Sequence, residues 1–176
     1  MILDLVTAAK YNQWANDRVY RALSAMSDDS RKLNRRGFFS SIHNTLNHIL
    51  LVDLLYRGRL DGKGNIFNGL NLILHDDFNA LADAQRESDE WYITFYSQFD
   101  NGRLDDKFVF APVGMDEGQI YGQTYRVCFT NLFQHQIHHR GQTHHMISHA
   151  EVAPPPLDFI MFSREANDEW SAPVQG

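Results

Sequence analysis

The chain has 176 residues, of which 43% are hydrophobic; this is enough for one domain with a buried core, and we predict a single domain over residues 1–176. The net charge of −6 argues against a nucleic-acid-binding protein, which usually carries a basic face. Because there is no apolar run long enough for a membrane span, no signal-peptide pattern and only one cysteine, Cys128, we expect a cytoplasmic protein without membrane contact or an intrachain disulfide.

The first half of the chain contains two stretches of helical periodicity. In residues 5–26, apolar and small side chains recur at steps of three and four, which predicts a helix. The polar residues 27–30 interrupt this pattern and are expected to end the helix. The second stretch covers residues 42–60, with Ser40 or Ser41 as its cap and glycines 58, 62 and 64 near its end. Between them, a basic cluster is predicted to be a solvated loop; it consists of Arg31, Lys32, Arg35 and Arg36.

The second half predicts two more helices with a different element between them. The third helix is expected to start near His75–Asp76 and to continue to Phe99. The period changes over residues 100–123, which indicates a short hairpin or an extended loop. The fourth helix is expected to run from near Thr124 to a point before Pro154, and residues 157–170 are expected to add a short helix.

Four helices with this spacing favour an all-α fold, an up-and-down four-helix bundle packed at shallow angles, with a hairpin or extended loop between helices 3 and 4. An all-α fold with steeply crossed helices is the alternative that the pattern leaves open.

Histidine is the unusual feature of the composition. Five of the nine histidines lie between His135 and His145. His135 and His139 are four residues apart on the inward stripe of the last helix, so one ion can bind both. His48 lies among apolar residues of the second helix and is the best third ligand. Three neutral imidazoles leave a coordination position open, which is typical of a catalytic or ligand-binding ion.

Other residues near these histidines have less certain roles. Gln136 occupies the place of the glutamate in the H-E-x-x-H protease motif, and an amide cannot act as a base, so a zinc protease is disfavoured. Cys128 is predicted to be a small core residue. Gln142 either bonds a metal-bound group or is a buried amide bonded to a neighbouring helix. Asp53 is predicted either to support the ligands from behind or to pair with another helix, rather than to bind the ion, and Gly141 to permit close helix approach.

Four segments together resemble the DinB-like superfamily of bundle proteins, which includes the YfiT-type proteins. The most specific is the run His135, His138, His139, Arg140, Gly141 and Gln142, of the form H-x-x-H-H-R-G-Q. The others are residues 11–16, residues 45–50 with Asp53, and residues 154–158.

The resemblance implies a four-helix bundle with a metal on His48, His135 and His139, the same residues that the spacing selects. It also implies nickel or zinc, with iron or manganese as alternatives, and a homodimer. Some members of the superfamily use a low-molecular-weight thiol as a cosubstrate, among them thiol transferases and the mycothiol-dependent maleylpyruvate isomerase.

We therefore predict one divalent metal ion per chain and a metal-dependent enzyme that acts on a small molecule, of the thiol-dependent S-transferase or isomerase type. The alternatives are a metal-dependent hydrolase and a non-catalytic metal-binding module of a stress response. No carboxylate base is evident beside the ligands, although Asp116 or Glu117 could approach the open face. The missing base favours thiol transfer over hydrolysis.

Overall fold

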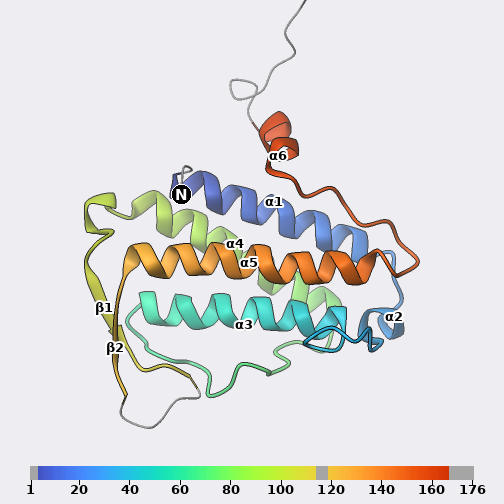
Figure 1. The fold of residues 1–176 in the computed structure, drawn as a ribbon, viewed down its shortest axis with the longest axis horizontal. Coiled ribbons are helices and arrows are strands. Elements are labelled where there is room, and N and C mark those ends of the chain that lie inside the picture. The colour runs from blue at the N-terminus through green and yellow to red at the C-terminus, as the bar shows by residue number, and fades with distance from the viewer. Residues whose placement is uncertain (1–3, 114–118, 167–176) are drawn as a thin grey trace, which may run out of the picture.

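The computed structural model describes residues 4–113 and 119–166. Four long helices lie side by side along its longest axis (Figure 1); they are α1 (Leu5–Leu23), α3 (Ile42–Leu60), α4 (Phe78–Gln98) and α5 (Tyr125–Ile147). A hairpin of β1 (Lys107–Phe110) and β2 (Tyr121–Thr124) lies at one end, beyond a 3-10 helix over Asn101–Arg103, and the short helix α2 (Asp28–Lys32) lies at the other. A final helix, α6, covers Phe159–Ala166. The predicted all-α fold and the hairpin are confirmed.

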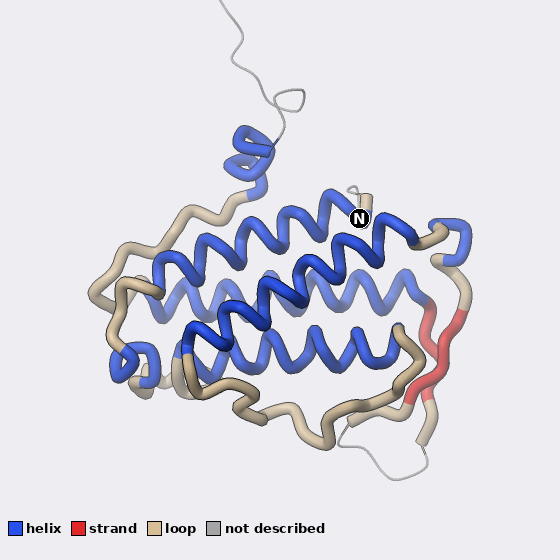
Figure 2. The backbone as a smooth tube through the Cα atoms, turned by 180° about the vertical axis from the view of Figure 1, so that it is seen from behind, coloured by secondary structure: helices blue, strands red, loops and turns tan. Residues whose placement is uncertain are grey.

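The helices form a ring in which α1 contacts α4 and α5, and α3 contacts the same two helices. Residues 61–77 run back along the bundle as a long loop (Figure 2). As a result, α3 and α4 point in the same direction, while α1 and α5 point the opposite way (Figure 1). The predicted up-and-down order of the helices is therefore wrong, although the four-helix bundle is present. This crossover places α3 and α5 next to each other, which brings the predicted histidines onto facing helices.

Each long helix begins at a side-chain cap. Asp4, Ser41, Asp77 and Thr124 each accept a hydrogen bond from the backbone N–H three residues later. Such caps satisfy N–H groups that have no partner within the helix and contribute about 1 kcal/mol each. Ser41 is thus the cap of the predicted pair, and α4 starts slightly later than the sequence predicts.

The predicted solvated loop around Arg31 is wrong. Ser27 caps α2, and Arg31 is buried at the end of that helix. Its Nη1 donates to the carbonyl oxygen of Leu23, the last residue of α1, at 3.0 Å and to that of Met26 at 2.5 Å. The guanidinium also lies 4.1 Å from the centroid of the Phe78 ring. Arg31 therefore terminates α1 and fastens α2 to the bundle.

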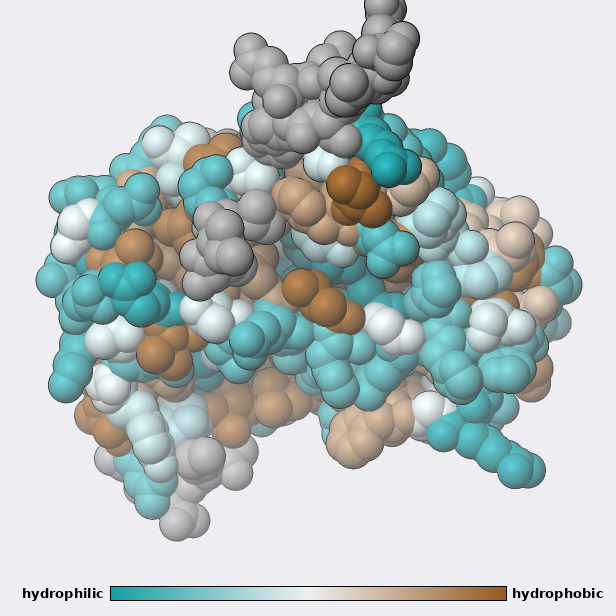
Figure 3. Space-filling model, turned by 45° about the horizontal axis from the view of Figure 1, so that its top comes forward, coloured by the Kyte–Doolittle hydropathy of each residue, from teal (hydrophilic) through white to brown (hydrophobic). Residues whose placement is uncertain are grey.

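The apolar core fills the space between the helices in two clusters, and Cys128 is fully buried in one of them. Burial raises the pKa of the Cys128 thiol to about 12, so the predicted structural role is confirmed. No described helix is long and apolar enough to cross a membrane. On the face shown in Figure 3, hydrophobic residues are scattered in small groups among hydrophilic ones.

A buried polar network crosses the middle of the bundle. Arg140, only 2% exposed, donates from Nη1 to Asn12, to Asn16 at 3.1 Å and to Gln136 at 3.2 Å. Amide groups then connect the guanidinium to two buried carboxyl groups: Gln136 and Gln85 donate to Asp53, while Asn12, Asn16 and Gln85 donate to Asp89. Asp53 thus bridges helices, as predicted.

This network makes the stability of the fold depend on pH. Burial, with the Asp53 charge as a further cause, raises the pKa of Asp89 to about 8, while an unfolded aspartate has a pKa of about 3.9. The folded state therefore holds a proton that the unfolded chain releases. Above about pH 6.5, where histidines are neutral in both states, the free energy of unfolding falls as pH rises to about 8. Asp89→Asn should flatten this decline in urea unfolding at constant ionic strength. An unchanged slope in the variant would show that Asp89 is ionised throughout.

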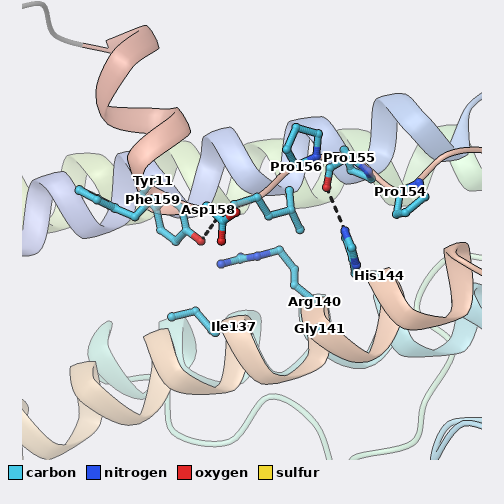
Figure 4. A pocket seen from close by; sticks show the side chains of 11 residues that line it. Tyr11, Ile137, Arg140, Gly141, His144, Pro154, Pro155, Pro156, Asp158 and Phe159 are labelled. Carbon is cyan, nitrogen blue, oxygen red and sulfur yellow. Dashed lines mark hydrogen bonds between the residues drawn. The ribbon is translucent and has the colours of Figure 1, made fainter. Parts of the chain in front are cut away.

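The C-terminal segment crosses α1 and α5 and encloses a pocket with them (Figure 4). Tyr11 Oη donates to the Leu157 carbonyl at 2.8 Å, and His144 Nε2 lies 3.0 Å from the Pro155 carbonyl oxygen. Gly141 lines this pocket, and among the described residues no atom beyond its own stretch of helix lies within 4 Å of the position that a Cβ would take. The prediction that Gly141 permits close helix approach is therefore wrong.

Gly141→Ala is expected to raise the free energy of unfolding by about 0.5–1 kcal/mol, because glycine inside a helix loses more backbone entropy than alanine and nothing obstructs the added methyl. Urea unfolding at two protein concentrations measures this. A loss of stability would mean that another molecule packs against this face of α5.

Candidate metal centre

Three histidine side chains from facing helices converge on one point. His48 comes from α3, and His135 and His139 come from successive turns of α5. One ring nitrogen from each lies within 4.8 Å of the others, and the Nε2 atoms of His48 and His135 are 3.0 Å apart. Two nitrogens on one tetrahedral zinc lie about 3.3 Å apart. In the part of the chain that the structure describes, these three residues could therefore hold a metal ion.

Hydrogen bonds orient two of the three rings. His48 Nδ1 lies 2.8 Å from the carbonyl oxygen of Leu70, and His139 Nδ1 lies 2.8 Å from Oε1 of Gln142. An oxygen acceptor at Nδ1 fixes the proton there and leaves the Nε2 lone pair free for a metal. The Phe39 ring stacks on His48 at 4.0 Å between centroids and limits its rotation further.

The third ring, that of His135, is not fully hydrogen-bonded within the described residues, so a metal ion could bind to it. His135 Nδ1 is buried and has no hydrogen-bond partner in the described residues, while Nε2 faces only another imidazole. Burial lowers the pKa of His135 to about 3 and that of His139 to about 4, and it also lowers the pKa of His48. All three rings are then neutral near pH 7, with lone pairs available. Neutral imidazoles that face one another with incomplete hydrogen bonding suit a shared cation.

The crossover loop is held against α3 by Asn47, the residue before His48. The Asn47 side chain is fully buried, and its Oδ1 accepts hydrogen bonds from the backbone N–H groups of Leu74 at 2.8 Å and His75 at 3.0 Å. The loop that supplies the Leu70 carbonyl is thereby fixed to the helix that supplies His48. Asn47 belongs to the segment 45–50 that the sequence singled out, but a role in positioning the loop could not be inferred from it.

Gln142 has a different role from either of the two that the sequence suggested. It is half-buried and bonds to His139, while its Nε2 lies 3.1 Å from Nε2 of His138 on the same helix. It thus holds a ligand ring, and in the described residues both of its hydrogen bonds stay within α5. The spacing of three residues from His139 is the signal in the sequence that could have indicated this.

Gln142→Ala is expected to weaken zinc binding about 10–100-fold, since groups that orient a ligand typically contribute this much. Competition with a chromophoric chelator measures the dissociation constant. His145→Ala is the matched control on the same helix, because His145 is exposed and contacts His149 rather than the cluster. Equal affinities for the two variants would contradict the orienting role.

The remaining histidines lie outside the cluster. His138, His145 and His149 are exposed, while His144 is half-buried against the C-terminal segment. His43 is buried, with Nε2 at 3.1 Å from the Asn47 amide. Asp116 and Glu117, the suggested bases, lie outside the described residues.

Comparison with known proteins identifies the family of the chain. The family model of the DinB family matches residues 1–172, nearly the whole sequence. The chain belongs to the DinB family. No functionally curated protein matches the sequence. The DinB resemblance read from the sequence is confirmed by this match, whereas the reaction has to be argued from the site.

Proposed function

We propose that this DinB-family protein binds one divalent ion, zinc or nickel, on His48, His135 and His139, and that the loaded site transfers or isomerises small molecules with the help of a thiol. Three nitrogen ligands leave a position open for a thiol or a substrate atom. An ion bound there would lower the pKa of a thiol or a water molecule at that position.

One observation supports a thiol over water as the partner. A pocket of about 570 Å³ adjoins the histidines, a size suited to a small molecule. Its described lining consists of aromatic, aliphatic, amide, histidine and arginine side chains, with no carboxylate. A hydrolase needs a base to activate water, whereas a thiol needs only a lowered pKa.

The side chains of the protein orient the reacting groups and exclude water from them. The histidines fix where the sulfur would bind, and the backbone carbonyl of Leu70 and the side chain of Gln142 keep their rings in place. Phe39 and Val52 line the same pocket and exclude water from the reacting atoms. In transfer to an aryl chloride, the sulfur forms a bond to carbon, the carbon–chlorine bond breaks, chloride leaves and the thiol proton goes to solvent.

Zinc- or nickel-loaded protein should accelerate the conjugation of cysteine or glutathione to 1-chloro-2,4-dinitrobenzene above the uncatalysed rate. The His135→Ala variant should lose this acceleration. In the cobalt-substituted protein, the same thiols should add a sulfur-to-cobalt charge-transfer band. Ester hydrolysis without a thiol effect would favour the hydrolase, and metal binding without either activity would favour a non-catalytic module.

A further inference from the structure

The pocket beside the histidines has a cationic far end. It continues along α3 past Val52 and Leu55 to Tyr56 and Arg59. His48 and Arg59 are 11 residues apart, which is about 16 Å along a helix axis. The pocket therefore joins a polar end at the histidines to a positive end at Arg59 through an apolar middle.

Aromatic rings, rather than a carboxylate, hold Arg59 in place. Its guanidinium carbon lies 4.2 Å from the centroid of the Phe110 ring and 5.1 Å from that of Tyr56. Nε donates to Oδ1 of Asn65 at 3.0 Å, and Arg59 forms no ion pair with a carboxylate in the described part of the chain. Stacking orients a guanidinium but leaves its charge and most of its donors unmatched.

The neighbouring Arg57 shows the contrast. It lies two residues earlier on α3 and pairs with Glu87 at 3.4 Å, and it is not part of the pocket lining. Arg59, by comparison, is half-buried in the pocket wall without such a partner. A partly desolvated guanidinium without a carboxylate partner favours an anion from solution.

We propose that Arg59 binds the carboxylate of an organic acid whose apolar body lies along Val52, Leu55 and Phe110 and whose other end reaches the histidine cluster. A single guanidinium balances one negative charge, which favours a carboxylate over a dianionic phosphate. A guanidinium also matches a carboxylate through two parallel hydrogen bonds. The carboxylate can belong either to the thiol or to the molecule that receives it. The contact of the other end with a metal rests on the proposed function, whereas the Arg59 contact does not.

The first experiment uses metal-free protein, so that its result is independent of the metal. Calorimetry should show that octanoate binds at least about tenfold more tightly than octanamide. This is the gain in affinity expected from a hydrogen bond to a charged group. Arg59→Gln should remove this preference, and Arg59→Lys should restore only part of it, because lysine lacks the planar fork. Arg57→Gln, which breaks an ion pair outside the pocket, should retain it.

Equal binding of octanoate and octanamide to the unmodified protein would overturn the proposal, and so would a preference that survives in Arg59→Gln. Circular dichroism and the melting temperature establish that each variant is folded. A carboxylate preference that depends on Arg59 supports the proposal even if the zinc-loaded protein transfers no thiol, so the two failures are distinguishable.

The second experiment identifies the source of the carboxylate. With cobalt-loaded protein, ω-mercaptoalkanoates of increasing chain length are compared with ω-mercaptoalkanols of equal length through the sulfur-to-cobalt band. If the mercaptoalkanoate binds more tightly than the mercaptoalkanol at one chain length, and Arg59→Gln removes this difference, the carboxylate that Arg59 binds belongs to the thiol. No advantage at any length, together with octanoate binding that depends on Arg59, places it on the acceptor; both results support a carboxylate at Arg59.

Discussion

Replacing His135 with alanine is expected to abolish stoichiometric metal binding. The three rings form a nearly equilateral triangle, with the His135 centroid 5.0 Å from that of His48 and 4.3 Å from that of His139, and 4.7 Å between His48 and His139. Without it, two nitrogens remain on facing helices, and a divalent ion loses a third of its protein ligands. Removal of a group that only orients a ligand costs about 10–100-fold in affinity, so removal of the ligand itself should cost more.

The measurement is the metal content of untagged protein after incubation with zinc or nickel and gel filtration. The unmodified chain should hold about one ion, and His135→Ala should hold almost none. His145→Ala removes an exposed histidine from the same helix and should retain the ion. Equal metal content in all three proteins would show that the ion binds elsewhere, and a change of fold in His135→Ala is detected by circular dichroism.

Arg140→Met is expected to lower the free energy of unfolding by about 3–5 kcal/mol, a cost typical of breaking a buried charge network. The free energy of unfolding of a typical domain is only about 5–15 kcal/mol in total. Burial raises the pKa of both Asp53, to about 7, and Asp89, to about 8. The Arg140 charge opposes both shifts, and the amides of Asn12 and Gln136 join its guanidinium to the two acids.

Urea unfolding near pH 7 measures this effect. The protein is kept metal-free, so that a change in metal binding at the neighbouring His139 does not contribute to the measured stability. Arg86→Met is the matched control: Arg86 pairs with Asp83 on the surface, with side-chain exposures of 52% and 73%, so its loss should cost less than about 0.5 kcal/mol. Adding Asp89→Asn to Arg140→Met should restore part of the stability, because it removes a buried acid. A cost below about 1 kcal/mol for Arg140→Met would contradict the role of the network.

Much of the fold could be predicted because periodicity and caps are local. Steps of three and four identify the long helices, and Ser41 and Thr124 mark two of their starts. The crossover of residues 61–77 and the resulting direction of α4 could not be predicted, since they depend on tertiary contacts such as those of Asn47. Arg31 was misjudged because its partners, backbone carbonyls at the end of α1, have no sequence signature.

The histidine cluster could be predicted for a similar reason. A spacing of four residues puts His135 and His139 on one face of a helix whatever the rest of the fold does. The groups around them were less accessible: the Leu70 carbonyl is 22 residues from His48 in the sequence, and Phe39 comes from a loop that seemed merely solvated. A role for Arg59 could be inferred only from the structure, which places it in the same pocket as the histidines.

Anomalous scattering from a crystal of zinc-loaded protein, recorded at the zinc edge, tests the metal centre most directly. We predict a single strong peak per chain, bonded to nitrogens of His48, His135 and His139, at roughly 2.0–2.1 Å. A fully loaded crystal with its peak at the exposed His138, His145 or His149, or with no peak between α3 and α5, would contradict the three-histidine site and the function proposed from it.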